Sequence, residues 1–224
     1  MCGRYLALTE KEIIEIRSIL HGISLRLVKD DIDNYSLRVA GEVRPTDFAP
    51  IISKSKEGVS FENAKFGFKH WDGNKPIINA RSETISVKNM FSKLLVAGRC
   101  VIPAKEYYEW KEKIEENEAS GIKRKRKPQK VKHFIKDNDG NLLFFAGLYQ
   151  EGKDGREFVI ITKDSVGDVA VVHDRMPVIL KTDQLESWLN GSLTPDDITQ
   201  MDFNANVAPC EDEPKSDSIQ LSLF

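Results

Sequence analysis

The sequence VKHFIKDNDGNLLFFAGLY at residues 131–149 decides the fold class. Residues 131–136 and 142–149 are short runs rich in apolar and aromatic side chains, a composition typical of β-strands. The DNDGN segment at residues 137–141 is typical of a tight turn, because Asp, Asn and Gly adopt the backbone angles that such turns require. The stretch therefore predicts a β-hairpin.

The same pattern continues on both sides of this stretch. Further short apolar runs lie at residues 99–104 and 158–162, and strands are also expected at residues 48–52, 59–68 and 177–180. Strands joined by short turns, with helices between some of them, are typical of an α+β fold. We expect its core to be a curved, mostly antiparallel, barrel-like β-sheet.

Helices are predicted to flank this sheet. Residues 9–12 form a capping box, and the apolar side chains that follow recur at helical spacing until Gly22. Residues 84–95 and 183–190 also have helical spacing, the latter closed by Gly191, and Thr194-Pro195 is typical of a helix start. The core face of the first helix is expected to hold Ile13, Ile16 and Leu20.

The chain is expected to form one domain over residues 1–203, followed by a flexible, acidic tail over residues 204–224. Within the domain, residues 23–44 are polar and are expected to be irregular. Residues 111–132 contain an acidic piece and then the basic run KRKRK at 123–127. Such a run is typical of a solvated loop, although beside a nucleic-acid groove it would attract phosphates.

The composition argues against several classes of protein. A net charge of −2 gives no overall basic field of the kind common in duplex-DNA binders. No apolar run is long enough to cross a bilayer, and the N-terminus lacks a signal sequence, so a cytoplasmic protein is expected. The three cysteines lack metal-ligand spacing, so we expect no disulfide, metal or cofactor, with Cys100 in the core and Cys210 idle in the tail.

Cys2 carries the chemistry that distinguishes this chain. Removal of Met1 would leave a free α-amine and a thiol on one residue. The amine has a reference pKa of about 7.7–8.0, so a fraction of it is nucleophilic near neutral pH and can condense with an aldehyde. The thiol can then attack the imine and close a thiazolidine ring, which an internal cysteine cannot do because its nitrogen is an amide. Serine would close an analogous ring poorly, because its oxygen is a weaker nucleophile.

Five blocks of sequence carry a further signal: MCGRY at 1–5, NARSET at 79–84, RCVIPA at 99–104 running into YYEW at 107–110, FAGL at 145–148, and HDRMPVIL at 173–180. Together these blocks resemble the SRAP family, the SOS-response-associated peptidases that shield abasic sites in DNA. The resemblance covers residues 1 to about 190 and implies a single SRAP-type domain. It also implies roles in the SOS response and in DNA repair.

The resemblance implies that the protein removes its own Met1 and then links Cys2 covalently to the abasic sugar. It further implies that Asn79 holds the sugar or the new ring by hydrogen bonds. Glu109 would stabilise the protonated imine and move protons, and His173 would act as general acid and base on the sugar and its 3′ phosphate. These residue types suit the chemistry, because imidazole exchanges protons near neutral pH and a carboxylate stabilises a developing iminium.

Structural roles are the alternative for these residues. Without the resemblance, His173 is more often a structural histidine, Glu109 an outward strand residue and Asn79 a turn former. One departure from the family pattern bears on this choice: Lys105-Glu106 replaces a small turn before Tyr107, so Glu106 competes with Glu109 for the same role.

Single-stranded DNA is held by cations on phosphates and by flat side chains under bases. We expect such contacts from Arg4, Trp71, Arg81 and Arg175, with Pro45 as a minor candidate. Trp71 is alternatively a core residue, and the two later arginines are alternatively buried partners of Glu83 and Asp174. The sequence also departs from the family pattern at Phe66-Gly67-Phe68, where the family usually has a tryptophan-glycine pair and this chain keeps only the aromatic character.

A second signal lies at residues 220–224, QLSLF, which resemble the peptide by which bacterial replication proteins bind the sliding clamp. Leu221, Leu223 and Phe224 would enter an apolar pocket, and Gln220 would fix the register. An ordinary apolar segment is the alternative. Clamp binding would place the protein at replication forks on the nucleoid, where single-stranded abasic sites arise.

Three functions from different classes follow. The first is a monomeric sensor that crosslinks abasic sites in single-stranded DNA, with a weak lyase activity because an imine at C1′ acidifies the C2′ protons. The second is an N-terminal-nucleophile cysteine peptidase or amidohydrolase that uses Cys2, Glu109 and His173. The third is a non-catalytic module that binds the clamp.

Overall fold

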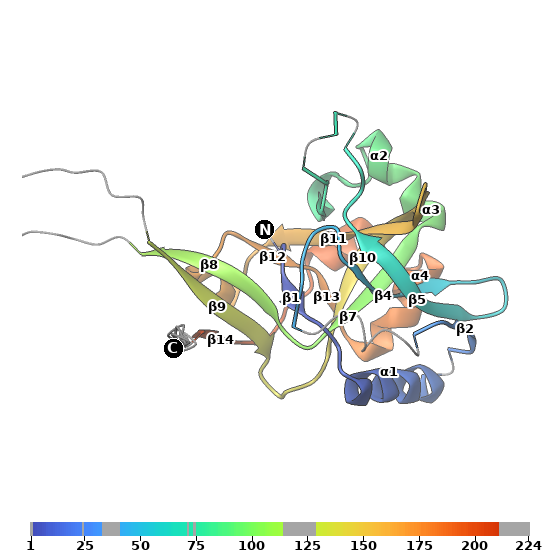
Figure 1. The fold of residues 1–224 in the computed structure, drawn as a ribbon, viewed down its shortest axis with the longest axis horizontal. Coiled ribbons are helices and arrows are strands. Elements are labelled where there is room, and N and C mark those ends of the chain that lie inside the picture. Colours follow the sequence, from blue (N-terminus) through green and yellow to red (C-terminus); the bar gives the residue numbers. More distant parts are fainter. Residues whose placement is uncertain are drawn as a thin grey trace, which may run out of the picture.

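Five strands of the described chain close into a barrel in the computed structural model, which describes residues 2–23, 25–32, 41–70, 72–73, 75–113 and 129–210. Neighbouring strands pair antiparallel in the order β5-β4-β7-β10-β11, and a parallel pairing of β11 with β5 at Phe158 and Phe66 closes the ring (Figure 1). The strands are β4 Phe48–Lys54, β5 Val59–Phe66, β7 Arg99–Ala104, β10 Leu143–Gly152 and β11 Gly155–Asp164.

The barrel strands are apolar over long continuous runs because both of their faces are covered. All six residues of β7 are buried, and so are the first six of β10. Aromatic side chains fill the interior: Phe66 stacks on Phe158 with ring centres 5.1 Å apart, and Tyr5 meets both Phe66 and Phe145 edge-on at 5.9 Å. Aromatic pairs of this kind add to the stabilisation that burial of their area provides.

A second sheet in the described chain has the order β14-β9-β8-β1-β3 and is antiparallel throughout. Its longest strands, β8 and β9, form a hairpin that projects from the barrel (Figure 1). Only two residues separate the end of β7 from the start of β8, so the chain passes directly from the barrel into this sheet. The strands are β1 Tyr5–Leu6, β3 Glu42–Val43, β8 Tyr107–Lys113, β9 Gln129–Asp137 and β14 Ala205–Pro209.

Short strands and helices complete the described chain. The strands are β2 Leu27–Asp30, β6 Asn79–Arg81, β12 Arg175–Pro177 and β13 Ile179–Leu180. The α-helices are α1 Glu10–Gly22, α2 Asn89–Ser92, α3 Leu94–Ala97, α4 Leu185–Asn190 and α5 Pro195–Thr199. The 3₁₀ helices are η1 Ser82–Thr84, η2 Gly167–Val171 and η3 Thr182–Gln184. None of the helices in the described ranges combines the length and apolar character that crossing a bilayer requires.

The α+β class and the mostly antiparallel, barrel-like core are confirmed. The capping box at the start of α1 is also confirmed, with the Thr9 backbone N–H donating to the Glu12 carboxylate at 2.8 Å. Helix α4 ends at Gly191, whose φ of +89° is a conformation that favours glycine. The side chain of Thr194 accepts a hydrogen bond from the Asp197 backbone and so caps α5.

The predicted hairpin at residues 131–149 is wrong. A tight turn does form, because the Asp137 carboxylate accepts hydrogen bonds from the backbone of Asp139 and Asn141, and Gly140 has a φ of +79°. The flanking strands, however, belong to different sheets: β9 pairs with β8 and β14, whereas β10 pairs with β7, β11 and β13. Turn chemistry is local and does not determine whether the two strands pair across the turn.

Three further predictions need correction. Residues 84–95 do not form one helix: α2 and α3 are separate short helices, and Met90 and Val96 are exposed, so no continuous apolar face exists. Residues 23–44 include two strands where irregular chain was expected. The tail expected from residue 204 does not hold for Ala205–Pro209, which pair with β9 as β14 because Val207 lies opposite the buried Ile135.

Replacing Gly147 with alanine is expected to destabilise the barrel by about 1–3 kcal/mol, the usual cost of overpacking a core. Gly147 lies in β10, and a Cβ there would come within 2.3 Å of Ile102 Cδ1 and 2.8 Å of the Val159 carbonyl oxygen. Chemical denaturation measures the change. Gly22→Ala is the control, because a Cβ there meets nothing within 4 Å, and equal stability losses in the two variants would contradict the prediction.

Candidate active site around Cys2

Four residues from distant parts of the sequence meet next to the N-terminal strand. The Asn79 side-chain amide donates a hydrogen bond to the Cys2 carbonyl oxygen at 3.1 Å. His173 Nε2 lies 3.9 Å from a Glu109 carboxylate oxygen, and Glu109 interacts electrostatically with the Cys2 thiol. The structure therefore brings all four sequence-predicted chemical residues, Cys2, Asn79, Glu109 and His173, into one site.

Both sheets contribute to this site. Asn79 begins β6, which pairs parallel with barrel strand β11, with Asn79 opposite Ile160. Glu109 lies in β8, and the backbone hydrogen bond from Tyr108 N to Arg4 O, at 2.9 Å, fixes the N-terminal residues alongside that strand. The position of Cys2 therefore depends on the junction between the barrel and the second sheet.

Cys2 is fully buried, which sets its acid–base behaviour. Burial raises the pKa of the thiol well above its ordinary value, and the nearby Glu109 carboxylate raises it further. A hydrogen bond from the Arg4 backbone favours the thiolate but does not reverse the shift. The thiol is therefore protonated at rest, and its attack on a carbon requires a base to take the proton.

Glu109 is suited to be that base. Its side chain is almost completely buried, and desolvation raises the pKa of the carboxyl group, while the nearby His173 opposes the rise. A carboxylate whose pKa is raised accepts a proton more readily than one in water. Glu106, the competing carboxylate, instead accepts a hydrogen bond from the Tyr108 hydroxyl at 2.6 Å. The structure thus favours Glu109 over Glu106 for the role beside His173.

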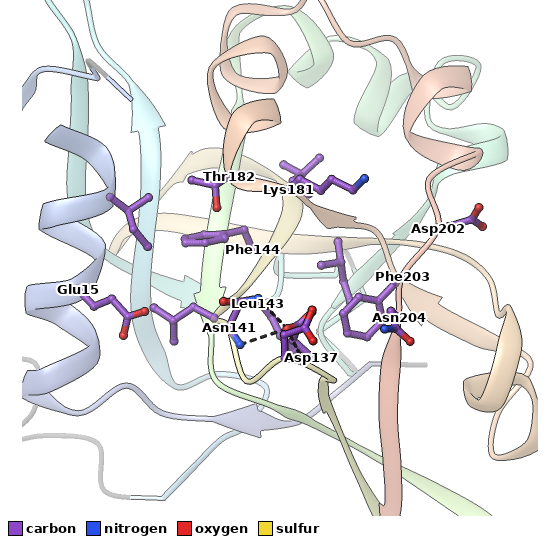
Figure 2. A pocket seen from close by; sticks show the side chains of 15 residues that line it. Glu15, Asp137, Asn141, Leu143, Phe144, Lys181, Thr182, Asp202, Phe203 and Asn204 are labelled. Carbon is purple, nitrogen blue, oxygen red and sulfur yellow. Dashed lines mark hydrogen bonds between the residues drawn. The ribbon is translucent and has the colours of Figure 1, made fainter. Parts of the chain in front are cut away.

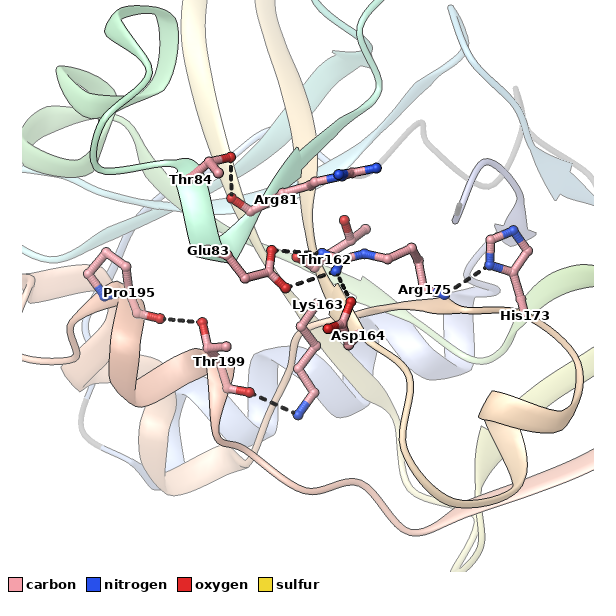
Figure 3. Close-up of polar contacts among 10 residues, drawn as sticks. All are labelled: Arg81, Glu83, Thr84, Thr162, Lys163, Asp164, His173, Arg175, Pro195 and Thr199. Carbon is pink, nitrogen blue, oxygen red and sulfur yellow. Dashed lines mark hydrogen bonds and ion pairs between the residues drawn. The ribbon is translucent and has the colours of Figure 1, made fainter.

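The orientation of the His173 ring is set by its own loop. The Arg175 backbone N–H donates to His173 Nδ1 at 2.9 Å (Figure 3). Asp174 also lies 2.8 Å from Nδ1, but a nitrogen that accepts from the backbone cannot donate to a carboxylate, and the Asp174 side chain is exposed to water. We therefore assign the ring proton to Nε2, the nitrogen that faces Glu109.

Arg175 is committed to a network of its own (Figure 3). Its guanidinium group donates to the Glu83 carboxylate through two nitrogens, at 2.8 and 3.0 Å, and to the Thr162 carbonyl oxygen at 2.8 Å. Asp164 accepts a further hydrogen bond from the same group. The structure therefore favours the alternative in which Arg175 is a buried partner of Glu83, with Asp164 rather than Asp174 as its second carboxylate.

The other candidates for DNA contact differ in how far their side chains are exposed to solvent. Arg4 is partly exposed, with its guanidinium group over the Trp110 ring at 4.9 Å, and Arg81 is exposed on β6 next to Asn79. Pro45 is half-buried in the turn before β4. Trp71 and the clamp-binding candidates lie outside the described residues, as do Met1 and the 123–127 basic run.

Phe66 and Phe68, which lie where the sequence differs from the usual family pattern, belong to the core. Phe66 stacks on Phe158, and Phe68 packs near Phe91 with ring centres 6.4 Å apart. Both are fully buried, so neither presents a face to a base.

Sequence reasoning missed Tyr107, which the structure adds to the site. The residue is fully buried, its hydroxyl has no hydrogen-bond partner among the described residues, and it interacts electrostatically with Cys2 and Glu109. Burial raises the pKa of this phenol well above its ordinary value, so the hydroxyl remains a donor. The two-residue spacing from Glu109 along a strand was the available signal, because such residues share one face.

A separate pocket of about 410 Å³ lies away from this site (Figure 2). It is formed where the turn at Asp137 approaches β10, β13 and the chain before β14. Residues that line it include Glu15, Leu143, Phe144, Lys181 and Asn204, and none of the four chemical residues is among them.

Replacing Glu83 with glutamine is expected to lower the free energy of unfolding by about 2 kcal/mol, because a buried arginine loses its charged partner. Hydrogen bonds from Arg175 hold the pKa of Glu83 below its ordinary value. This stabilisation is therefore present above the ordinary pKa and is lost as the pH falls through the lowered one. Thermal unfolding of both proteins across acidic pH should show their difference shrinking.

The control for this prediction is Glu151→Gln, which removes the partner of an exposed ion pair with Arg156. Such pairs contribute roughly 0–1 kcal/mol, so little change is expected. A Glu83 variant as stable as the Glu151 variant at neutral pH would contradict the proposed role of the network.

The fold and the site together define an α+β protein whose N-terminal segment carries a buried cysteine beside a carboxylate, an amide and an imidazole. The sequence profile of the SOS response associated peptidase (SRAP) family matches residues 1–214. The chain belongs to this family.

Named relatives and solved structures agree with this assignment. The chain is 35% identical over 174 residues to the abasic site processing protein YoqW of Bacillus subtilis, a match that covers 71% of this chain and 69% of the relative. The abasic site processing protein YedK of Escherichia coli is 25% identical over 204 residues, covering 87% and 82%. A protein from Bacteroides thetaiotaomicron superposes with a TM-score of 0.70 at 21% identity, covering 94% and 93%, and so shares the fold.

Proposed function

We propose that this protein senses and shields abasic sites in single-stranded DNA by forming a thiazolidine between Cys2 and the ring-opened sugar. The observation that carries the proposal is the convergence of a buried Cys2 with Asn79, Glu109 and His173. The relatives named abasic site processing proteins support the choice of substrate.

Removal of Met1 comes first. The Cys2 thiol attacks the carbonyl carbon of Met1, its proton passes by way of Glu109 to the peptide nitrogen, and the carbon–nitrogen bond breaks to leave a thioester. Water then hydrolyses the thioester, which releases methionine and restores the thiol. Glu109 is suited to this proton transfer because burial raises its pKa towards the range where a group both accepts and donates protons.

The crosslink forms in the next two steps. The free amine of Cys2 adds to the sugar aldehyde at C1′ to give a carbinolamine, which takes up a proton from solvent and loses water to leave a protonated imine. The thiol then attacks C1′ while its proton passes to Glu109, and the electron pair of the carbon–nitrogen double bond moves to nitrogen. Because burial keeps the thiol protonated, this transfer to Glu109 is needed for the carbon–sulfur bond to form.

Asn79 and His173 assist these steps through hydrogen bonds to Cys2 and to the sugar. The Asn79 amide already holds the Cys2 carbonyl at 3.1 Å, while its own side-chain oxygen is buried without a partner among the described residues and is left to accept from the sugar. His173, with its proton on Nε2, would donate to the sugar ring oxygen as the ring opens.

The surrounding cations suit a single DNA strand. Arg81 is exposed on the same strand as Asn79, and Arg4 lies two residues after Cys2, so we expect both to contact phosphates near the lesion. Pro45 is a minor contact in the neighbouring turn. Arg175 serves mainly to hold the His173 loop, since its guanidinium donors go to Glu83, Asp164 and Thr162.

One assay separates this function from the two alternatives. The mature protein is incubated with a single-stranded oligonucleotide that contains one abasic site, and the mixture is separated under denaturing conditions. A shifted band is the expected result. A peptidase or amidohydrolase that uses Cys2, Glu109 and His173 would give no shift but would turn over an amide substrate, and a non-catalytic clamp-binding module would do neither. A slow cleavage of the strand would accompany the shift if the imine also supports lyase activity.

Residues 220–224 are proposed to bind the bacterial sliding clamp and to bring the protein to replication forks on the nucleoid. Deleting them is expected to abolish clamp binding in a pull-down while leaving the crosslink yield unchanged. The matched control replaces Ser222, which lies between the apolar anchors, with alanine and should keep clamp binding. Retention of clamp binding by the deletion variant would end this part of the proposal.

A further inference from the structure

The outward face of the β8–β9 hairpin lies on the opposite side of the strands from Glu109. Side chains alternate along a strand, so Tyr107 and Glu109 face inward, whereas Tyr108 and Trp110 lie on the other face, where Tyr108 is buried and Trp110 is partly exposed. In β9, Phe134 pairs with Tyr108, and Lys132 pairs with Trp110. We call this surface the hairpin face; it consists of Arg4, Tyr108, Trp110, Lys130, Lys132, Phe134 and Lys136.

On the hairpin face, cations lie over aromatic rings. The Arg4 guanidinium group lies 4.9 Å from the centre of the Trp110 ring, and the Lys132 ammonium group lies 3.8 Å from that of Tyr108. Lys136 lies over Phe134 at 5.3 Å. Positive charges that follow a backbone and flat groups that stack on bases are the two elements by which proteins hold single-stranded nucleic acid.

The charge of this surface is complementary to a phosphate backbone. Glu42 is the central carboxylate, but its side chain is largely buried, and it already pairs with Arg4, Arg44 and Lys132. Lys130 pairs with Glu112, and both are exposed to solvent. The hairpin face itself holds four cations. With the neighbouring Arg44, Glu42, Glu106 and Glu112 included, the described residues of this region have five cations, Arg4, Arg44, Lys130, Lys132 and Lys136, and three carboxylates.

Arg4 connects the hairpin face to the Cys2 site. Its backbone N–H bonds to the Cys2 sulfur, its carbonyl accepts from Tyr108 N at 2.9 Å, and its side chain lies over Trp110. Strand β1 pairs with β8 only at Tyr5 and Tyr107, so Cys2 lies beyond the last paired residue, beside the edge of β8. A DNA strand that leaves Cys2 over this edge would reach the hairpin face next.

We propose that the hairpin face binds the single-stranded DNA that flanks the abasic site on one side. The inference rests on the proposed function and extends it from the lesion to the neighbouring nucleotides. The contact is to phosphates and base faces, so it carries no sequence preference.

The test uses the variant Lys130→Gln/Phe134→Ala/Lys136→Gln, none of whose residues belongs to the Cys2 site. Fluorescence anisotropy measures its affinity for an unmodified single-stranded oligonucleotide of about 15 nucleotides, a length within the usual range of site sizes for single-strand-binding proteins. We expect binding about tenfold weaker than that of the unaltered protein, from one lost stack and two lost phosphate contacts. The salt dependence of log Kd should flatten by about 1.4, because each lost phosphate contact on a single strand removes roughly 0.7. The matched control is Lys54→Gln/Lys56→Gln, at the turn between β4 and β5 in the other sheet, which should change neither quantity.

A crosslinking arm separates failure of this inference from failure of the proposed function. At saturating DNA, the hairpin-face variant should crosslink an abasic oligonucleotide to the same yield as the unaltered protein. If the unaltered protein forms no crosslink, the proposed function fails. If it crosslinks but the variant binds unmodified DNA with unchanged affinity and salt slope, the hairpin face is not a DNA surface. Should the triple variant be unstable, Lys130→Gln/Lys136→Gln decides the question by its salt slope alone.

Discussion

Replacing Cys2 with alanine is expected to abolish the denaturation-resistant complex with abasic DNA. Alanine keeps the α-amine, so an imine can still form, but no sulfur is present to close the ring and the imine hydrolyses. Cys2→Ser should give little stable product, because its hydroxyl is a much weaker nucleophile than a thiol. The measurement is the fraction of labelled oligonucleotide shifted in a denaturing gel.

The matched control is Cys100→Ala, which removes a second, equally buried thiol from strand β7. It is expected to lose some stability from the small cavity but to crosslink like the unaltered protein. An uncleavable extension ahead of Cys2 should act like Cys2→Ala, since the nitrogen then remains an amide. If either Cys2→Ala or the extended protein gave the same crosslink yield as the unaltered protein, the mechanism would be contradicted.

Replacing Glu109 with glutamine is expected to slow crosslinking by about 10²–10⁴-fold, the usual contribution of a positioned acid or base. The thiol of Cys2 is held protonated by burial, and glutamine cannot accept its proton. The rate is measured under single-turnover conditions. Glu106→Gln is the comparison, because Glu106 is the other carboxylate near this strand and bonds to Tyr108 instead.

The same substitution is expected to stabilise the fold. Desolvation raises the pKa of Glu109, so between its ordinary and its raised value the folded protein binds more protons than the unfolded chain. Stability therefore falls as the pH rises through this window, and glutamine removes that loss. A gain in the free energy of unfolding of roughly 0.5–2 kcal/mol at neutral pH is expected, the usual size of a single stabilising substitution. If Glu109→Gln crosslinked slowly and was also less stable than the unaltered protein at every pH, the role of Glu109 would be structural instead.

Local sequence patterns predicted the elements of this fold better than their pairing. The capping box at Thr9, the stop at Gly191 and the strand at residues 99–104 were all predictable, because each depends on nearby residues. The pairing across residues 137–141 was not, because the same turn serves two strands that separate into different sheets. The parallel pairing of β11 with β5 also has no local signal, since it joins residues distant in sequence.

The chemical site was predictable mainly through family resemblance. Cys2 alone followed from chemistry, because only residue 2 acquires an amine and a thiol together. Asn79, Glu109 and His173 each had an ordinary structural interpretation, and nothing in their spacing showed that the fold brings them together. The partner of Arg175 was one of two open alternatives until the structure placed it against Glu83. Tyr107 was missed because a buried tyrosine on a strand gives the same pattern whether its hydroxyl faces a reaction or only the core.

Strand β11 closes the barrel by pairing with β5, and it also pairs with β6, the strand that contains Asn79. Such contacts between distant parts of the chain form late in folding, because the loop that joins them must first be ordered. A half-folded chain therefore has a cysteine but no arranged partners beside it. We expect newly made copies to keep Met1 until Glu109 is in place beside Cys2, so that an amide stands where the free amine would be and the unfinished chain does not trap the small aldehydes of metabolism.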